Sequence, residues 1–166
     1  MEEKKEVTME MAALEGKYLT FRLAEEGYGL EILKVQEIIG MMSITRIPRT
    51  PDFIRGVINL RGKVIPVIDL RLKFSLEKKE DTEKTCIIVV QVKKNADDTV
   101  TMGIIVDEVS EVLDIKAEQI EPPPSFGAAM DTDFILGMGK ASQKVVMLLD
   151  VDKVLSRSEI EDLSKV

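Results

Sequence analysis

The sequence predicts an all-β fold made of two similar halves. Short runs of Val, Ile and Leu, broken by Gly, Pro and Asp, recur along the chain and are typical of strands joined by turns. A weak internal repeat divides these strands into two sets. With about five short strands, each half has the size of a small closed barrel.

The internal repeat has two offsets. A shift of 81 residues aligns one set of positions without a gap: Asp52, Phe53, Ile54, Gly56, Lys63, Val64 and Asp69 meet Asp133, Phe134, Ile135, Gly137, Lys144, Val145 and Asp150. A shift of 74 residues aligns Gly29, Val35 and Glu37 with Gly103, Val109 and Glu111. The difference of seven residues predicts a change of length in the stretch that contains the triple proline.

The N-terminal part of the chain combines a charged leader with four predicted strands. Residues 1–16 are charged and rich in methionine, and we expect a mobile leader with some helical character. The four strands have apolar, β-branched runs bounded by turn residues. They are Tyr18–Leu23, Tyr28–Ile32, Val35–Ile39 and Ile44–Ile47.

The stretch Phe53–Phe74 predicts a β-hairpin followed by a helical turn. Two apolar runs flank the corner Leu60-Arg61-Gly62, where Gly62 can adopt the positive φ that a tight turn needs. Pro66 donates no hydrogen bond, which places the second strand at a sheet edge or at a bulge. Asp69 is expected to cap the turn. Alternation puts Gly56, Ile58 and Leu60 on one face of the first strand and Val57, Asn59 and Arg61 on the other.

The second half repeats this pattern after a solvated connection, Ser75–Lys84. Prolines in Glu121–Pro124 favour extended, polyproline-like geometry. A short C-terminal helix is expected over residues 158–163, with Ser158 as its cap. Strands are predicted at Thr85–Val92, Val100–Val106, Val109–Leu113, Phe134–Met138 and Lys144–Leu149.

The composition limits the classes of partner. A chain of 166 residues suits one domain or one compact unit with two lobes. The formal net charge of −7 argues against nucleic acid and against direct binding to anionic membranes. An oligonucleotide-binding barrel is disfavoured for the same reason, since it needs a basic groove and stacking aromatics. The single cysteine, Cys86, fits a reducing cytoplasm without disulfides.

The residues also argue against an enzyme. The chain has no histidine, which removes the commonest general base and metal ligand, and no glycine-rich phosphate loop. We therefore expect no catalytic residues, no cofactor and no metal. Asp69 and Asp150 could form an acid–base pair, but each follows a strand at the same repeat position, which favours helix capping for both.

Four stretches together resemble the CheW family, the coupling proteins of bacterial chemotaxis. They are YLTFRLAEEGYGLEILKVQEIIG from Tyr18, RGVINLRGKVIPVIDLRLKF from Arg55, GIIVDEVSEVL from Gly103 and AEQIEPPPSF from Ala117. Their order matches the family, and they extend over nearly the whole chain from Lys17. The resemblance implies two SH3-like five-stranded β-barrels packed together, with strands interdigitated within one unit over residues 17–166.

The resemblance also implies a function in binding. Such an adaptor couples the cytoplasmic tips of methyl-accepting chemoreceptors to the regulatory domain of the histidine kinase CheA. It is cytoplasmic and is recruited to membrane-bound receptor arrays. A detached CheA-type regulatory domain, which has the same fold, is the nearest alternative.

The family's contact positions can be carried onto this chain. The receptor-binding candidates are Val35, Glu37, Gly56, Val57, Asn59 and Arg61. The kinase-binding candidates are Ile38, Ile44, Arg55, Ser125 and Phe126. The family usually has an acidic residue where this chain has Ser125, and Phe126 is either an exposed anchor or a plug over the core.

Arg61 allows three interpretations. It can be a solvated turn residue, it can contact a partner directly, or it can form an ion pair with Glu37 inside the fold. Arginine suits the last two, because its guanidinium pairs with a carboxylate through two hydrogen bonds.

Overall fold

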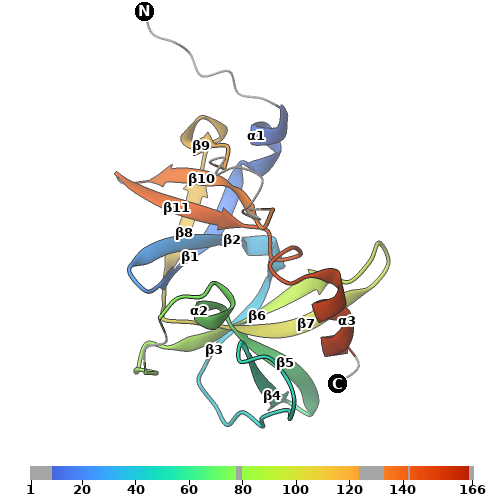
Figure 1. Ribbon diagram of the computed structural model, residues 1–166. Helices are drawn as coiled ribbons and strands as arrows, with labels where there is room; N and C mark the ends of the chain where they lie inside the picture. The colour runs from blue at the N-terminus through green and yellow to red at the C-terminus, as the bar shows by residue number, and fades with distance from the viewer. Residues whose placement is uncertain (1–8, 78–79, 124–132, 142, 165–166) are drawn as a thin grey trace, which may run out of the picture.

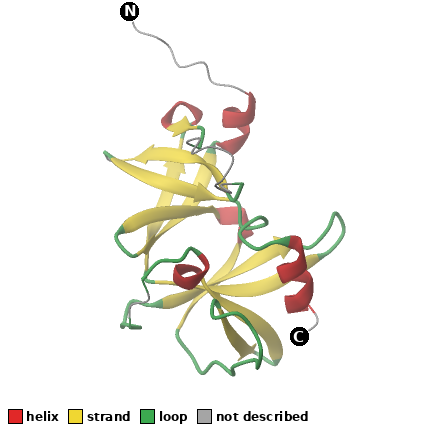
Figure 2. Ribbon diagram, viewed as in Figure 1, coloured by secondary structure: helices red, strands yellow, loops and turns green. Residues whose placement is uncertain are grey.

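The computed structural model describes residues 9–77, 80–123, 133–141 and 143–164, and it contains two antiparallel-rich sheets that pack against each other (Figures 1 and 2). The six-stranded sheet has the order β8-β1-β2-β11-β10-β9 and the five-stranded sheet the order β3-β6-β7-β5-β4. We call them the first and the second barrel. The predicted all-β class with two SH3-like barrels is confirmed.

The first barrel consists of β1 (Gly16–Leu23), β2 (Glu26–Glu31), β8 (Glu108–Ile115), β9 (Ile120–Glu121), β10 (Ile135–Ala141) and β11 (Lys144–Leu149). The second consists of β3 (Val35–Gly40), β4 (Ile54–Leu60), β5 (Lys63–Asp69), β6 (Cys86–Lys93) and β7 (Thr99–Val106). The short helices are α1 (Met9–Leu14), α2 (Leu70–Lys73), α3 (Arg157–Ser164), η1 (Ile32–Lys34) and η2 (Ala117–Gln119).

The second barrel is inserted between two parts of the first. The hairpin β1–β2 lies in the first barrel, but the next strand, β3, pairs with β6 of the second. The hairpin β6–β7 lies in the second barrel, but the next strand, β8, pairs with β1 of the first. The second barrel therefore consists of the consecutive strands β3–β7, whereas the first combines β1 and β2 with β8–β11 from the other end of the sequence. The chain crosses between the barrels at these two points.

The internal repeat is visible in the strand pairing. In the first barrel, Leu148 of β11 lies beside Gly29 of β2 in a parallel pair. In the second, Val67 of β5 lies beside Gly103 of β7, also in parallel. The offset of 81 relates Val67 to Leu148, and the offset of 74 relates Gly29 to Gly103. Both offsets thus describe the same structural pair.

Apolar side chains form three clusters. One lies inside the second barrel and contains Ile58, Ile65, Val67, Ile87, Val89 and Ile105. One lies inside the first and contains Tyr18, Ile115, Ile120, Val146 and Leu148. The largest draws side chains from both sheets, such as Leu19 and Phe21 from the first and Ile88 and Ile104 from the second. Each buried aliphatic side chain contributes about 1.5–3 kcal/mol, so this shared core holds the barrels together.

Two strand predictions need correction. Ile44–Ile47 is not a strand: only Thr45 forms an isolated bridge, with Val57. Pro48 has no N–H group to continue the pairing. Pro66 lies neither at an edge nor at a bulge, because β5 is an inner strand. Pro66 lies opposite Val57 and just before the pairing of β5 with β7 begins at Val67, so no partner on β7 needs its missing N–H.

The end of the chain also differs from the prediction. Ser156, not Ser158, caps α3, which begins at Arg157. The Ser156 hydroxyl accepts a hydrogen bond from the N–H of Glu159, and the Glu159 carboxylate accepts one from the N–H of Ser156. This reciprocal capping box explains why the helix begins at Arg157, one residue before the predicted range of 158–163. The capping turn at Asp69 is confirmed, since its carboxylate accepts from the N–H of Arg71.

Candidate functional site

An ion pair joins the two edge strands of the second barrel. Glu37 lies in β3 and Arg61 lies in the turn that follows β4, and β3 and β4 are the outer strands of that sheet. Arg61 Nη1 donates to Glu37 Oε1 over 3.0 Å, and Nη2 donates to Oε2. The hydrogen bonds from Arg61 lower the pKa of the Glu37 carboxyl. Of the three interpretations of Arg61, the structure shows the ion pair within the fold.

The turn that presents Arg61 is the tight corner expected at residues 60–62. Arg61 has φ 51° and Gly62 has φ 86°, so both central residues lie in the left-handed region, as in a type I′ hairpin turn. The side chain of Asn59 accepts a hydrogen bond from the N–H of Gly62 at 2.8 Å. Asn59 and Gly62 therefore fix the direction in which the Arg61 side chain leaves the strand.

Gly56 and Val57 lie beneath the segment that crosses β4 at Thr45. The N–H and C=O of Val57 both bond to Thr45, at 2.8 and 2.9 Å. Gly56 has φ 140°, and a Cβ there would lie 2.0 Å from the Thr45 carbonyl oxygen. Only glycine allows this crossing, so Gly56 shapes the surface through backbone geometry and not through a side chain.

Val35 is the one receptor candidate that packs against the shared core of the two barrels. It is half-buried at the start of β3. The six candidates thus lie along β3, β4 and the β4–β5 turn, from the shared core to the Arg61 corner.

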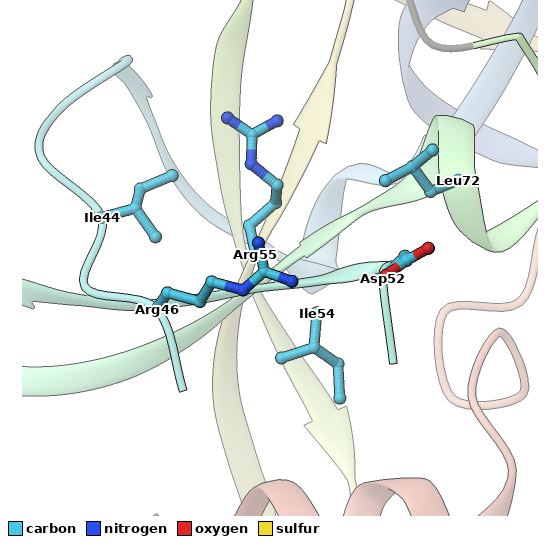
Figure 3. Close-up of a pocket in the computed structure, with 6 residues that line it drawn as sticks. All are labelled: Ile44, Arg46, Asp52, Ile54, Arg55 and Leu72. Atoms are coloured by element: carbon cyan, nitrogen blue, oxygen red, sulfur yellow. The ribbon is translucent and has the colours of Figure 1, made fainter. Parts of the chain in front are cut away.

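Two of the kinase-binding candidates line one surface pocket. Ile44 and Arg55 share this pocket with Arg46, Asp52, Ile54 and Leu72, and its volume is about 330 Å³ (Figure 3). Figure 3 shows the Arg46 side chain extended across the pocket between Ile44 and Ile54. Arg46 is exposed. Ile38 is 45% exposed on β3 and is not part of the pocket lining. Ser125 and Phe126 lie outside the described residues.

A buried cluster of ion pairs lies behind this pocket, and sequence analysis missed it. Arg71 is 1% exposed and donates to Asp69, Asp81 and Asp107 at 2.9–3.0 Å. Arg55 joins the same cluster through Asp69 at 3.1 Å and Asp81 at 3.3 Å. The pKa of Asp81 is lowered overall: burial alone would raise it, and the hydrogen bonds from Arg71 and Arg55 outweigh that effect.

This cluster changes the interpretation of two residues. Asp69 caps α2 as predicted, but its carboxylate is also the main partner of Arg71. Asp150, at the equivalent position, does not cap a helix as predicted: residues 151–153 form a turn, and the Asp150 carboxylate accepts the N–H of Asp152. Arg55 is anchored by carboxylates, so its guanidinium is held in place at the pocket wall. The one local signal in the sequence was the Asp69-Leu70-Arg71 triplet.

The described residues contain no group of His, Cys, Asp or Glu side chains arranged to hold a metal ion. None of the described helices has the length and apolar character that a membrane crossing requires. What the described surfaces offer is shape, apolar contact and fixed charge. Such features suit the recognition of another protein.

Comparison with known proteins gives consistent matches. The family model described as CheW-like domain matches residues 17–159. The chain is 44% identical to the chemotaxis protein CheW of Klebsiella aerogenes over 87% of this chain and 84% of that protein. It is 33% identical to the chemotaxis protein CheW of Helicobacter pylori, over 85% of this chain and 82% of that protein.

A solved structure extends the comparison to the fold. The crystal structure of the scaffolding protein TtCheW from Thermoanaerobacter tengcongensis matches with a TM-score of 0.75 and 41% identity. The match covers 84% of this chain and 92% of that one.

Proposed function

The chain belongs to the CheW family of chemotaxis adaptor proteins, and from this premise we propose that it couples chemoreceptor cytoplasmic tips to the regulatory domain of the histidine kinase CheA. It does so in the cytoplasm, at receptor arrays on the membrane, and by binding alone. Recruitment follows from contact with the receptors, not from contact with lipid.

The observation that carries this proposal is the presence of two separate candidate surfaces on one barrel. The receptor candidates centre on the Glu37–Arg61 pair, whereas Ile44 and Arg55 line the pocket beside α2. The two surfaces are joined by β4, which contains Arg55 at one end and Asn59 at the other. A rigid barrel that holds two partners at a fixed spacing is what an adaptor requires.

The Glu37–Arg61 pair supports a receptor-facing role through pre-organisation. An arginine held by two hydrogen bonds loses less freedom when a partner binds than a mobile side chain would. The exposed part of Arg61 can still donate to a partner, because its side chain is 67% exposed. A receptor hairpin that packs on Val57 and Asn59 would then meet a fixed polar rim.

The pocket supports a kinase-facing role through complementarity. Ile44, Ile54 and Leu72 provide apolar contact, and Arg46 and Arg55 provide cationic rims. We assign Ile38 to the same partner, because it is an exposed isoleucine on the neighbouring edge strand. Ser125 and Phe126 are proposed as a second kinase contact on the basis of the family resemblance.

A reconstituted ternary assay tests the proposal. The protein is mixed with a receptor cytoplasmic fragment and with CheA, and sedimentation and kinase activity are measured together. We expect receptor-dependent control of kinase activity only when all three are present. If the protein binds neither the receptor fragment nor the CheA regulatory domain, the proposal is wrong. ATP turnover by the protein alone would also contradict it.

Phe126→Ala tests the second kinase contact separately. If Phe126 is an exposed anchor, binary binding through the second barrel survives and the assembly of extended arrays fails. The thermal midpoint then stays nearly unchanged. A loss of stability of about 3–5 kcal/mol, as for a Phe→Ala cavity in a core, would instead identify a plug.

A further inference from the structure

The two barrels differ at one equivalent place, although the repeat otherwise relates them closely. Glu111 in β8 corresponds to Glu37 at the offset of 74. Glu37 follows an irregularity in the pairing of β3 with β6, and Glu111 lies within an irregularity in the pairing of β8 with β1, between Val109 and Val112. In the sequence, the residue 81 positions after Arg61 is Ser142, which has no cationic group. Among the described contacts, the Glu111 side chain has no hydrogen bond or ion pair, whereas Glu37 binds Arg61 through two.

The surface next to this pair is closed by polar side chains in the second barrel. Gln91 donates to Gln36 at 2.6 Å and to Thr101 at 2.9 Å. Lys63 donates to Thr101 at 3.5 Å. Together with Glu37 and Arg61, these side chains bridge β3, β6, β7 and the β4–β5 hairpin.

The first barrel has smaller residues at two of these positions. Ser110 replaces Gln36, and Gly27 replaces Thr101, both at the offset of 74. Lys144 corresponds to Lys63, and Arg22 pairs with Gly27 as Gln91 pairs with Thr101. Where the second barrel has a polar bridge, the first therefore has space.

That space is a pocket of about 540 Å³ between β1–β2, β8 and the β10–β11 hairpin. These strands belong to the upper barrel of Figure 1. Its charged lining residues are Glu25, Glu26, Glu111, Arg22 and Lys144. Three carboxylates thus face two cations, and within the described part of the chain none of the five forms an ion pair. Val145 at its edge is 52% exposed and offers an apolar contact. We call this pocket the Glu111 slot.

We propose that the Glu111 slot is a docking site for a protein partner that inserts an arginine carried on a β-turn. The arginine would pair with Glu111 as Arg61 pairs with Glu37, but between two molecules. The second barrel supplies the precedent: Glu37, at the equivalent position of the repeat, binds a turn arginine through two hydrogen bonds. The site is separate from the receptor and kinase candidates and does not depend on them.

Charge and shape support this occupant. The excess of carboxylate in the lining and the chain's net charge of −7 favour a cationic insert. Lys144 does not oppose it, because its counterpart Lys63 lies two residues after Arg61 in the second barrel, where the Glu37–Arg61 pair still forms. The aliphatic part of the inserted side chain can pack on Val145, which gives arginine an advantage over a compact ammonium group.

NMR titration with a short peptide tests the slot. The probe is the cyclised hexapeptide Asn-Leu-Arg-Gly-Lys-Val, the sequence of residues 59–64, added to the full ¹⁵N-labelled chain. We expect amide shifts confined to Gly27, Ser110, Glu111 and Val145. A peptide with alanine in place of arginine should produce none. The absence of localised shifts with the arginine peptide would overturn the proposal.

Two variants test the mechanism. Glu111→Gln should weaken peptide binding about tenfold, the difference between a charge-assisted pair and a neutral hydrogen bond. Glu108→Gln, the same change on the same strand but outside the pocket lining, should have no effect. Equal losses in both variants would overturn the proposal.

Filling the slot provides the second test. The double variant Gly27→Thr/Ser110→Gln restores the side chains that close the other barrel. A Cβ at Gly27 has its nearest neighbours at 3.9 Å, so the threonine should be accepted without strain. We expect a folded protein that no longer binds the peptide. Undiminished binding would overturn the proposal. A dimer of the unmodified chain that Glu111→Gln dissociates would also overturn it, because the occupant would then be a second copy of this chain.

Discussion

Arg71 Nη1 lies 2.9 Å from Asp107 Oδ1, and this ion pair ties the two barrels together. Asp107 lies between β7 of the second barrel and β8 of the first. Its other oxygen accepts the N–H of Ala24, in the β1–β2 turn, at 2.6 Å. One carboxylate thus connects α2, the strand crossover and the first hairpin.

Asp107→Ala should therefore destabilise the protein more than removal of an ordinary surface carboxylate. The change leaves one nitrogen of Arg71 and the N–H of Ala24 without their acceptor, at a cost of about 1–3 kcal/mol. Urea denaturation followed by circular dichroism measures the effect. Asp97→Ala, in the exposed β6–β7 turn, is the control and should be neutral. Equal midpoints for both variants would show that the Arg71–Asp107 pair does not stabilise the fold.

Asp69→Asn should be strongly destabilising. Asp69 is fully buried and accepts hydrogen bonds from Arg71 and Arg55. Removing its charge leaves the buried guanidinium of Arg71 partly uncompensated, which typically costs about 3–5 kcal/mol. Chemical denaturation at neutral pH provides the measurement. A loss below ~1 kcal/mol would mean that Asp81 and Asp107 alone suffice to hold Arg71.

Asp150→Asn, the equivalent change in the other half, should not destabilise the protein at neutral pH, in contrast to Asp69→Asn. Burial raises the pKa of Asp150, with a smaller contribution from the negative charge of Asp152. A raised pKa in the folded state means that the ionised carboxylate is disfavoured there. The protonated carboxyl of Asp150 is the favoured form in the folded protein. Its stabilising contribution is complete below the unfolded pKa, about 3.9, and is lost as the pH rises through the folded pKa.

At neutral pH the Asp150→Asn variant should therefore be as stable as the original protein or more stable, since the amide oxygen can still accept the N–H of Asp152. The difference should vanish in acid. Thermal midpoints measured across pH 3 to 7 test this. A variant that is less stable at neutral pH than at acid pH, relative to the original protein, would contradict the prediction.

Local pattern was sufficient for most of the strands and for the central hairpin, but not for Ile44–Ile47. The alternation in residues 54–60 predicted which side chains share a face of β4, and Asp69 was recognised as a cap. The repeat offsets predicted equivalent residues that pair in the same way, such as Val67 with Gly103 and Leu148 with Gly29. These features depend on neighbours in sequence or on self-similarity, both of which a single sequence contains.

Contacts between distant segments could not be predicted in the same way. Arg71 meets Asp81 and Asp107, which are 10 and 36 residues away, with no periodicity to link them. Thr45 pairs with Val57 only because Gly56 allows the chain to cross, which the apolar pattern of Ile44–Ile47 does not reveal. The role of Arg61 could be narrowed to three alternatives from the sequence, but the choice among them depended on how β3 and the β4–β5 turn come together in space.

Gly56→Ala should disrupt the crossing at Thr45. The new Cβ would lie 2.0 Å from the Thr45 carbonyl oxygen, and φ 140° disfavours any side chain. The segment must shift, and we expect a loss of about 1–3 kcal/mol together with weaker receptor binding. Gly40→Ala is the matched control, because a Cβ there meets nothing within 4 Å. Amide exchange at Val57 reports on the crossing. Unchanged protection of that amide would contradict this account.

Arg46→Glu should weaken binding of the CheA regulatory domain without affecting stability. Arg46 is exposed and lines the pocket with Ile44 and Arg55. Charge reversal at the rim of an interface mainly slows association, and we expect an increase in Kd of about tenfold at low salt. Surface plasmon resonance at two salt concentrations gives the rates. Arg49→Glu, in the next turn, carries the same charge change outside the pocket and is the control. Equal effects of both variants would mean that only net charge matters.

Arg61→Ala should impair ternary coupling while leaving the thermal midpoint nearly unchanged, because exposed ion pairs contribute little to stability. Glu37→Ala should behave similarly if the pair acts as a unit. A double-mutant cycle of unfolding free energies in the free protein measures the coupling between the two side chains. The same cycle for the free energy of receptor binding measures how far binding depends on that coupling.

The two cycles separate the remaining roles of Arg61. If the pair only braces the edge strands, the two single variants lose receptor binding to the same extent and the double variant loses no more. If Arg61 also contacts the receptor, Arg61→Ala loses more than Glu37→Ala. Arg61→Lys refines the result, since lysine keeps the charge but cannot form the two-fold hydrogen bond with Glu37. Normal coupling in Arg61→Ala would exclude both roles and leave the arginine a structural feature of the turn.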